Sequence, residues 1–312
     1  MDPQQGLVLG VGYGALRGGG GGAFATRAPS VRSALTCADI GVFVGVEPSG
    51  LSSRRDAPNV FSASGGALSV TSGRLSYSLG LVGPCYSIDT ACASALAALH
   101  ACVVAVAVAG ECASGLGTGT KVLSAAVNLA TSIAGMTSAF GRCHTFDRRA
   151  DGYCRGEGCG AYCVRANADG VAVVGSAVQQ DGPSASLTAP NGSSQQRLLE
   201  AVPGDGRPAL EAHGTGTALG DPIEVRVVLF RVRFSMDSSQ VGAATRAVRA
   251  PMASTSLKSN MGHLEAAAAA AGLASVVAGP LLAGIVPVNA QLRGYARAAS
   301  RTERARTRFT PG

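Results

Sequence analysis

The stretch YSIDTACASAL, residues 86–96, decides how this chain is expected to fold. Tyr86 to Asp89 have the character of a short strand, and a long apolar helix is predicted from about Ala93 to Ala109. Cys92 lies in the turn between the two. A strand that leads through a turn into a helix is the building unit of an α/β fold. We therefore predict an α/β protein whose helices pack on a largely buried sheet.

The same succession recurs at two later places in the chain. A short strand at 209–212 leads into the turn HGTGT, residues 213–217, and a helix is predicted to open at Asp221-Pro222, with proline in the first turn. A strand at 253–257 leads into KSNMGH, residues 258–263, and another helix. This recurrence hints at a duplicated βαβ plan.

Further elements are predicted around these units. Residues 40–46 are apolar and β-branched and indicate a buried strand, and residues 64–78 have helical spacing. Strands are predicted at 160–165 and 171–180, and the division between two halves is expected between them. The stretch 115–121 contains GTGTK, but its spacing fails the phosphate-loop pattern, so a loop is predicted there.

Length and composition indicate a globular protein with a sizeable core. The chain has 312 residues, of which 46% are hydrophobic, and a net charge of +7. Residues 291–312 alone carry six arginines against one glutamate, a net +5, which leaves +2 for the rest. The basicity is therefore concentrated in a tail predicted to be disordered, and we expect no nucleic-acid partner.

Cysteine usage and apolar stretches bear on the cellular compartment. Nine cysteines, an odd number, without an amino-terminal signal peptide indicate free thiols in a reducing compartment. A cytoplasmic location is expected, with a plastid left open. The apolar stretch 96–110 is too short to cross about 30 Å of hydrocarbon, and 264–284 is mostly alanine with Gly272, Gly279 and Pro280. Both are predicted to be buried helices, and no membrane span is expected.

Cys92 is the candidate nucleophile. A thiolate attacks a thioester, and the positive end of the helix dipole lowers the pKa of a cysteine at a helix start. Its neighbours Ala91, Ala93 and Ser94 are small and leave room for a substrate.

His213 and His263 are the candidate proton donors. Each lies in a glycine-rich turn and could donate a hydrogen bond to a carbonyl oxygen that gains negative charge, or shuttle a proton. Lys258, five residues before His263, is expected to support that imidazole, the alternative being a surface lysine.

Two other patterns carry less weight. GVGYGA, residues 10–15, satisfies a dinucleotide fingerprint, but no clear strand precedes it and no acidic residue follows at the required distance. Cysteines and a histidine gather between Cys143 and Cys163 without the paired two-residue spacing that zinc sites favour. We expect ordinary buried thiols there, and no metal.

The three motifs resemble those of β-ketoacyl synthases, most closely the ketosynthase domains of modular (type I) polyketide synthases. The family carries a DTAC nucleophile motif, an HGTGT histidine and a KSNxGH histidine, found here at 89–92, 213–217 and 258–263. Further segments agree in the family's order: DPQQ at 2–5, GRC at 141–143, TFD at 145–147, ADGY at 150–153, RGEG at 155–158, DG at 181–182, APNG at 189–192 and GDPIE at 220–224. The resemblance covers about residues 2 to 290.

This resemblance implies a thiolase-like fold with two similar βαβ-rich halves in five layers (αβαβα), usually a homodimer. Cys92 would take an acyl chain from a phosphopantetheine thioester delivered by an acyl carrier protein or coenzyme A. A malonyl-type extender would lose CO2, and its enolate would attack the acyl group, with His213 and His263 stabilising the charge. Thr215 and Thr217 would bind the pantetheine arm. No bound cofactor is expected.

Three regions are predicted from the resemblance: residues 1–165 as the half that carries the nucleophile, residues 166–290 as the half that carries both histidines, and the tail at 291–312. Two histidines favour a decarboxylating synthase over a chalcone synthase or a thiolase. The family's strand before DPQQ and its later GFGGTNAH stretch have no counterpart here, so we expect a chain incomplete at both ends. The alternative function is an inactive ketosynthase fragment that serves docking or dimerisation in a larger synthase.

Overall fold

The computed structural model describes residues 1–18, 35–51, 59–166, 171–186, 189–202, 209–224, 253–278 and 289–293. The chain divides into two compact units. The first consists of residues 1–130, 155–172 and 264–273, and the second of residues 131–154, 173–263 and 274–312. Each unit is therefore assembled from segments that are distant in the sequence.

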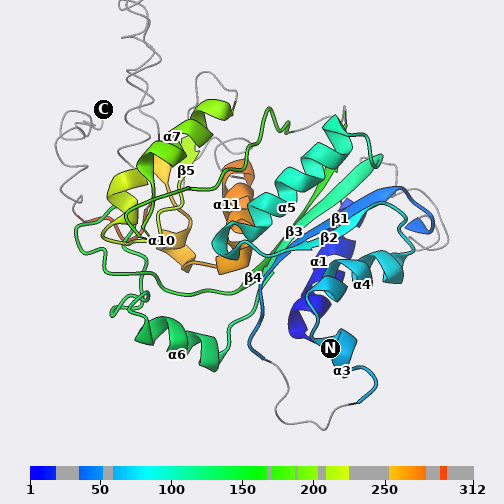
Figure 1. Cartoon of the computed structure of the whole chain (residues 1–312), viewed down its shortest axis with the longest axis horizontal. Coiled ribbons are helices and arrows are strands. Elements are labelled where there is room, and N and C mark those ends of the chain that lie inside the picture. The colour runs from blue at the N-terminus through cyan, green and yellow to red at the C-terminus, as the bar shows by residue number, and fades with distance from the viewer. Residues whose placement is uncertain are drawn as a thin grey trace, which may run out of the picture. The chain divides into compact units, whose positions relative to one another are not determined.

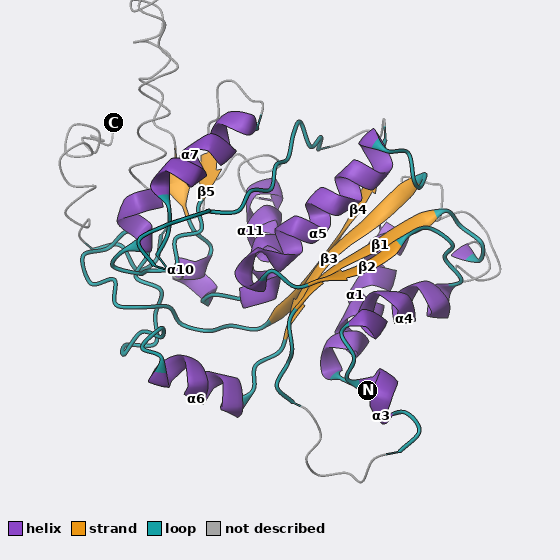
Figure 2. Cartoon of the chain, in the orientation of Figure 1, coloured by secondary structure: helices purple, strands orange, loops and turns teal. Residues whose placement is uncertain are grey.

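The first unit is built around a mixed four-stranded sheet (Figure 2). Its strands are β1 (Ile40–Val46), β2 (Cys85–Ile88), β3 (Ser114–Lys121) and β4 (Gly158–Arg165), in the order β2-β1-β3-β4. The pairs β1–β2 and β1–β3 are parallel, and β3–β4 is antiparallel. Every residue of β1 is buried, because strands flank it and helices cover both faces. The strands predicted at 40–46, 86–89 and 160–165 are confirmed.

Helices cover the two faces of this sheet (Figure 1). Helices α1 (Pro3–Gly18) and α4 (Ser69–Leu79) contact each other and pack on one face, with the four-residue α3 (Ser62–Gly65) before α4. Helix α5 (Ser94–Val103) packs on β1 and β3 from the other face. Val8 of α1, Leu75 of α4 and Leu116 of β3 are fully buried in one core cluster. The glycine fingerprint at 10–15 lies within α1, which rules out a phosphate-binding turn there.

Strand β3 corrects a prediction, because we expected a loop at 115–121. Gly115, Gly117 and Gly119 lie on the face of β3 toward α5, where side chains would collide with the helix. A Cβ on Gly119 would lie 2.5 Å from the Cβ of Ala95, and one on Gly115 would overlap the sulfur of Cys102. The glycines therefore allow helix and strand to approach closely and do not mark a turn.

The helix at Cys92 has about the predicted extent, but it begins earlier than the apolar stretch 96–110 on which the membrane argument rested. A 3-10 turn η1 (Ala91–Ala93), α5 and a π-helical turn η2 (Val104–Val108) run continuously, and this 18-residue segment is long and apolar enough to cross a membrane. The argument that the segment is too short was therefore wrong. Ala98, Cys102, Ala105 and Val106 of this segment belong to a core cluster with Phe43 of β1. A helix of a protein core passes the same test of length and composition.

The second unit contains a two-stranded parallel sheet formed by β5 (Ala209–Glu211) and β6 (Ala253–Thr255). Both strands were predicted, although each is shorter than expected. Helix α7 (Gly192–Ala201) is capped by Asn191, whose side chain accepts hydrogen bonds from the N–H groups of Ser193 (3.1 Å) and Ser194 (3.3 Å). The short helix α10 (Lys258–Met261) follows β6. Helix α6 (Ala125–Ile133), the 3-10 turn η4 (Glu265–Ala267) and α11 (Ala268–Val276) complete the described elements.

One predicted strand is absent from the described residues. Residues 171–180 form no helix or strand, and Val171, Val173, Val174 and Val178 are exposed. Alternating apolar residues favour an extended backbone, but a strand also needs a hydrogen-bonded neighbour, and no described residue pairs with this segment. The predicted tail at 291–312 lies outside the described residues except for 291–293.

Candidate functional site

A tight turn in the first unit carries Cys92. Ala91 has φ of +51°, a left-handed backbone that costs energy in a residue other than glycine. Three hydrogen bonds hold this turn: Asp89 Oδ1 accepts from the N–H of Ala91 (3.1 Å), Ser94 Oγ accepts from the N–H of Thr90 (2.8 Å), and Ser94 Oγ donates to the carbonyl of Ala91 (2.7 Å). Cys92, half-buried, is therefore presented by a fixed backbone at a helix start.

The strand next to this turn fixes where the helix begins. Gly45 of β1 lies so close to the helix that a Cβ would stand 2.5 Å from the carbonyl oxygen of Ser94. Only glycine allows this approach without displacing backbone atoms. The position of Cys92 thus depends on a glycine that is 47 residues earlier in the chain.

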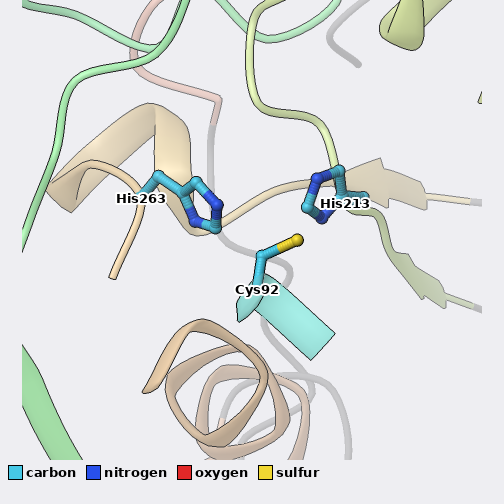
Figure 3. Close-up of side chains that lie close together, drawn as sticks. All are labelled: Cys92, His213 and His263. Carbon is cyan, nitrogen blue, oxygen red and sulfur yellow. The ribbon is translucent and has the colours of Figure 1, made fainter. Parts of the chain in front are cut away.

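His213 and His263 lie together in the second unit. Their rings meet edge to face, with centroids 5.5 Å apart and planes at 88° (Figure 3). His263 is buried, its N–H donates to the carbonyl of Cys154 (2.7 Å), and its ring makes a second edge contact with Tyr153 at 5.2 Å. Two residues fifty positions apart in the sequence thus lie side by side.

The carboxylate of Glu224 fixes the backbone at His213. Its two oxygens accept hydrogen bonds from the N–H groups of His213 (2.6 Å) and Gly214 (2.9 Å). On the other side of the turn, the hydroxyl of Thr145 donates to the carbonyl of Gly214 (2.5 Å), and Ser256 Oγ donates to that of His213 (3.3 Å). Gly214 has φ of +44°, which favours glycine at this position. The turn is therefore tied on both sides.

Asp221 organises the rest of this loop. It is buried, and Oδ1 accepts from the N–H groups of Gly216 (3.1 Å) and Thr217 (3.2 Å) while Oδ2 accepts from Phe146 (2.7 Å). Burial raises the pKa of Asp221 to about 6, although these hydrogen bonds oppose the shift. Asp221 therefore connects two loops of the second unit.

Lys258 is buried at the start of α10, so the surface-lysine alternative is wrong. Its ammonium lies within electrostatic reach of His213, Glu211 and Glu224. Desolvation of the ring, and then Lys258, lower the pKa of His213 to about 4, although the residue as a whole is exposed. His213 is therefore neutral at neutral pH and has one N–H to donate.

Glu211 adds a second buried carboxyl group near Lys258. Its Oε1 accepts a hydrogen bond from the N–H of Leu257 (2.6 Å), which links the ends of β5 and β6. Burial raises the pKa of Glu211 to about 7, the hydrogen bond and Lys258 opposing the shift and Glu224 adding to it. Burial likewise raises the pKa of Glu224.

The two threonines of the HGTGT turn have different surroundings. Thr215 is buried, and Thr217 is half-buried. The hydroxyl of Thr217 accepts a hydrogen bond from the N–H of Gly220 (3.2 Å), which leaves its own proton available to a ligand. Their expected contact with a pantetheine arm stays a prediction.

Sequence reasoning proposed the histidines, the lysine and the threonines of the second unit and the cysteine of the first as site residues. It assigned no role to Glu211, Asp221, Glu224 or Tyr153, although three of them lie in segments that agree with the family pattern. Carboxyl groups within a dozen residues of a glycine turn are the signal that could have found the first three. By residue type, Cys92, His213 and His263 are ligands that zinc prefers, and the expectation of no metal stays a prediction.

Most of the chain matches two known protein domains. Residues 1–169 match the β-ketoacyl synthase N-terminal domain, and residues 171–292 match the C-terminal domain of the same family. The chain belongs to the β-ketoacyl synthase family. It has the thiolase-like fold of ketosynthases, with the mixed α/β sheet described above.

Known relatives are modular polyketide synthases of type I. The chain is 38% identical over 298 residues to erythronolide synthase EryA2 of Saccharopolyspora erythraea, covering 89% of this chain and 8% of that protein. It is 37% identical over 297 residues to the pikromycin polyketide synthase component PikAII of Streptomyces venezuelae, covering 89% and 7%. The chain thus spans a small part of these relatives.

The structure of this chain is also similar to solved structures of ketosynthases. The ketosynthase from module 6 of the bacillaene synthase of Bacillus subtilis 168 superposes with a TM-score of 0.77 at 28% identity, covering 96% of this chain and 51% of that one. The oxazolomycin ketosynthase domain OzmH KS7 of Streptomyces albus JA3453 also gives 0.77, at 29% identity, covering 95% and 51%. The chain spans about half the length of these solved ketosynthases.

Proposed function

We propose that this chain is a β-ketoacyl synthase that condenses a Cys92-bound acyl chain with a malonyl-type thioester. The observation that carries the proposal is the edge-to-face pair of His213 and His263, at the two histidine positions of a family whose models match the chain. Its substrates would be phosphopantetheine thioesters carried by an acyl carrier protein or coenzyme A. The product would be a polyketide or a fatty acid intermediate.

The first half-reaction loads Cys92. Its sulfur attacks the acyl thioester carbonyl, the C–S bond to pantetheine breaks, and the pantetheine thiol leaves with a proton. The backbone N–H of Cys92 would be one donor to the oxyanion that forms. The tight turn supports this role, because the hydrogen bonds of Ser94 and Asp89 fix the backbone around the sulfur.

The second half-reaction forms the new carbon–carbon bond. The extender loses CO2, and the electron pair of the broken bond becomes an enolate on the thioester. His213 and His263 would donate N–H groups to that oxygen, and a neutral His213 is suited to donate. The enolate carbon attacks the acyl carbonyl, the bond to Cys92 breaks, and the thiolate is restored. Lys258 would support His263, and Thr215 and Thr217 would bind the pantetheine arm.

The finer architecture is part of the same proposal. Residues 1–165 would form the half with the nucleophile and 166–290 the half with the histidines, in a five-layer homodimer, followed by a basic tail at 291–312. A cytoplasmic location stays a prediction.

The proposal is tested by supplying the purified chain with an acyl thioester and a malonyl thioester of the same carrier. We expect a β-ketoacyl thioester and one CO2 per product with the wild type, and no product with Cys92→Ala. A folded wild-type chain that forms neither product nor CO2 would favour the alternative, an inactive ketosynthase piece that serves docking or dimerisation.

A further inference from the structure

Four charged side chains meet in the first unit, and three of them, Lys121, Arg155 and Glu265, are largely buried. Glu47 follows β1, Lys121 ends β3, Arg155 precedes β4, and Glu265 begins η4. The ammonium of Lys121 lies 3.2 Å from Glu47 Oε2 and 3.2 Å from Glu265 Oε2, with only 1% of its side chain exposed. Two cations and two anions balance, so this charge network is neutral as a whole.

Glu265 contacts both cations of the network. The guanidinium of Arg155 binds it in bidentate fashion, through Nε to Oε1 and through a terminal nitrogen to Oε2 (2.7 Å). Burial acts to raise the pKa of Glu265, but Arg155 and Lys121 outweigh it and hold the pKa below its usual value. Glu265 is therefore ionised at neutral pH.

The charge network also fixes the backbone of this segment. Glu47 Oε1 accepts a hydrogen bond from the N–H of Ala266 (3.1 Å), next to Glu265. Glu265 itself has φ of +47°, an unfavourable conformation for a residue with a side chain. Such residues persist only where their surroundings impose the conformation, and they cluster at functional sites.

Stability alone explains this arrangement poorly. The cost of desolvating buried charges often cancels their attraction, and a well-packed apolar cluster is commonly as stable. Ion pairs do impose a definite geometry, because bidentate contacts tolerate little displacement. The function of the charge network is therefore sought in the segments whose backbone it fixes.

We propose that the charge network of Glu47, Lys121, Arg155 and Glu265 positions His263. Glu265 is two residues after His263, and Arg155 directly follows Cys154, whose carbonyl accepts the N–H of His263 (2.7 Å). The charge network thus holds the chain next to both ends of the hydrogen bond that anchors the backbone of His263. All four are positioning residues, and their catalytic consequence rests on the role proposed for His263.

The direct test is amide hydrogen exchange of His263 in the wild type and in Glu265→Gln. The substitution keeps the size of the side chain and removes the charge that Arg155 and Lys121 share. We expect exchange at His263 to accelerate at least tenfold, while Val44, in the centre of β1, exchanges as before. Glu157→Gln is the matched control, because Glu157 is exposed and contacts the N–H of Leu123 rather than the charge network.

Activity supplies the second measurement. Glu265→Gln is expected to slow CO2 release from a malonyl thioester about tenfold or more with KM unchanged, and to leave the rate of Cys92 acylation within about twofold. Unchanged exchange at His263, or equal acceleration at His263 and Val44, would overturn the positioning role. If Glu265→Gln does not fold, Lys121→Met is measured in the same way. A wild type without CO2 release refutes the proposed function, while the exchange data still decide whether the charge network positions His263.

Discussion

The imidazole rings of His213 and His263 pack edge to face, with their centroids 5.5 Å apart. Two imidazoles so close cannot both be charged at little cost, because like charges repel strongly at this separation. Desolvation of the ring and the cation of Lys258 keep His213 neutral around pH 7. The pair is therefore suited to donate two hydrogen bonds rather than to hold two positive charges.

Removing either imidazole is expected to slow decarboxylation. His213→Ala and His263→Ala should each lower CO2 release from a malonyl thioester about 100-fold or more, as the loss of one donor to a developing oxyanion does elsewhere. The measurement is CO2 release per enzyme, with acylation of Cys92 followed in parallel. His100→Ala, on α5, is the control. Unchanged CO2 release in both variants would contradict the assigned role.

Glu224 is expected to matter through the backbone of His213. In Glu224→Gln only one oxygen remains to serve two N–H groups, and a hydrogen bond to a charged group contributes about 1.5–3 kcal/mol. We predict a lower unfolding midpoint in urea and slower CO2 release. Glu200→Gln, on the exposed end of α7, supplies a carboxyl-to-amide control and should change neither. Equal behaviour of the two variants would refute the assignment.

The buried carboxyl of Glu211 should make stability depend on pH. Its pKa is raised to about 7, so the folded state binds a proton that the unfolded state releases near pH 4.5. Its contribution is fully present below about pH 4.5 and is lost as pH rises through about 7. We therefore predict that Glu211→Gln gains stability relative to the wild type between pH 5 and 8, measured as the difference in Tm. A difference that stays constant or shrinks would contradict this.

Glycine substitutions should separate close packing from helix propensity. Gly45→Ala forces a methyl group against the backbone of Ser94. We expect it to lower the free energy of unfolding by about 1–3 kcal/mol and to slow acylation of Cys92. Gly10→Ala places a methyl group in open space on α1 and should raise the free energy of unfolding by about 1 kcal/mol. Denaturant titration of both variants makes the comparison. Similar effects of the two substitutions would show that the contact with Ser94 is unimportant.

The sequence predicts most of the first unit, because its strands are short apolar runs whose burial leaves a local signal. Residues 40–46 form the predicted strand to the residue. The strand at 114–121 was not predicted. Its glycines are needed because α5 packs closely against them, and this contact comes from another part of the chain. At residues 171–180 the error is the opposite, because a strand was predicted and none is formed. An alternating apolar pattern does not show whether a neighbouring strand is present to pair with it.

The residues of the candidate site and of the charge network likewise differ in whether the sequence could reveal them. Cys92, His213 and His263 stand out because their residue types are rare and their turns are distinctive. Glu47 and Lys121 could not be found, because their ion pair joins the ends of two strands that are 74 residues apart. Pairing of this kind follows from the register of β1 with β3, which only the folded chain specifies.

The most direct test of the central claim is the mass of the intact chain after incubation with an acyl thioester. We predict an increase equal to one acyl group in the wild type, located on the peptide that contains Cys92, and released by hydroxylamine as a thioester. Cys92→Ser should carry no such thioester adduct, while Cys85→Ser, which removes an exposed cysteine of β2, should react like the wild type. A folded wild type without the adduct, or a Cys92→Ser variant that still forms it, would contradict the assignment of Cys92 as the nucleophile.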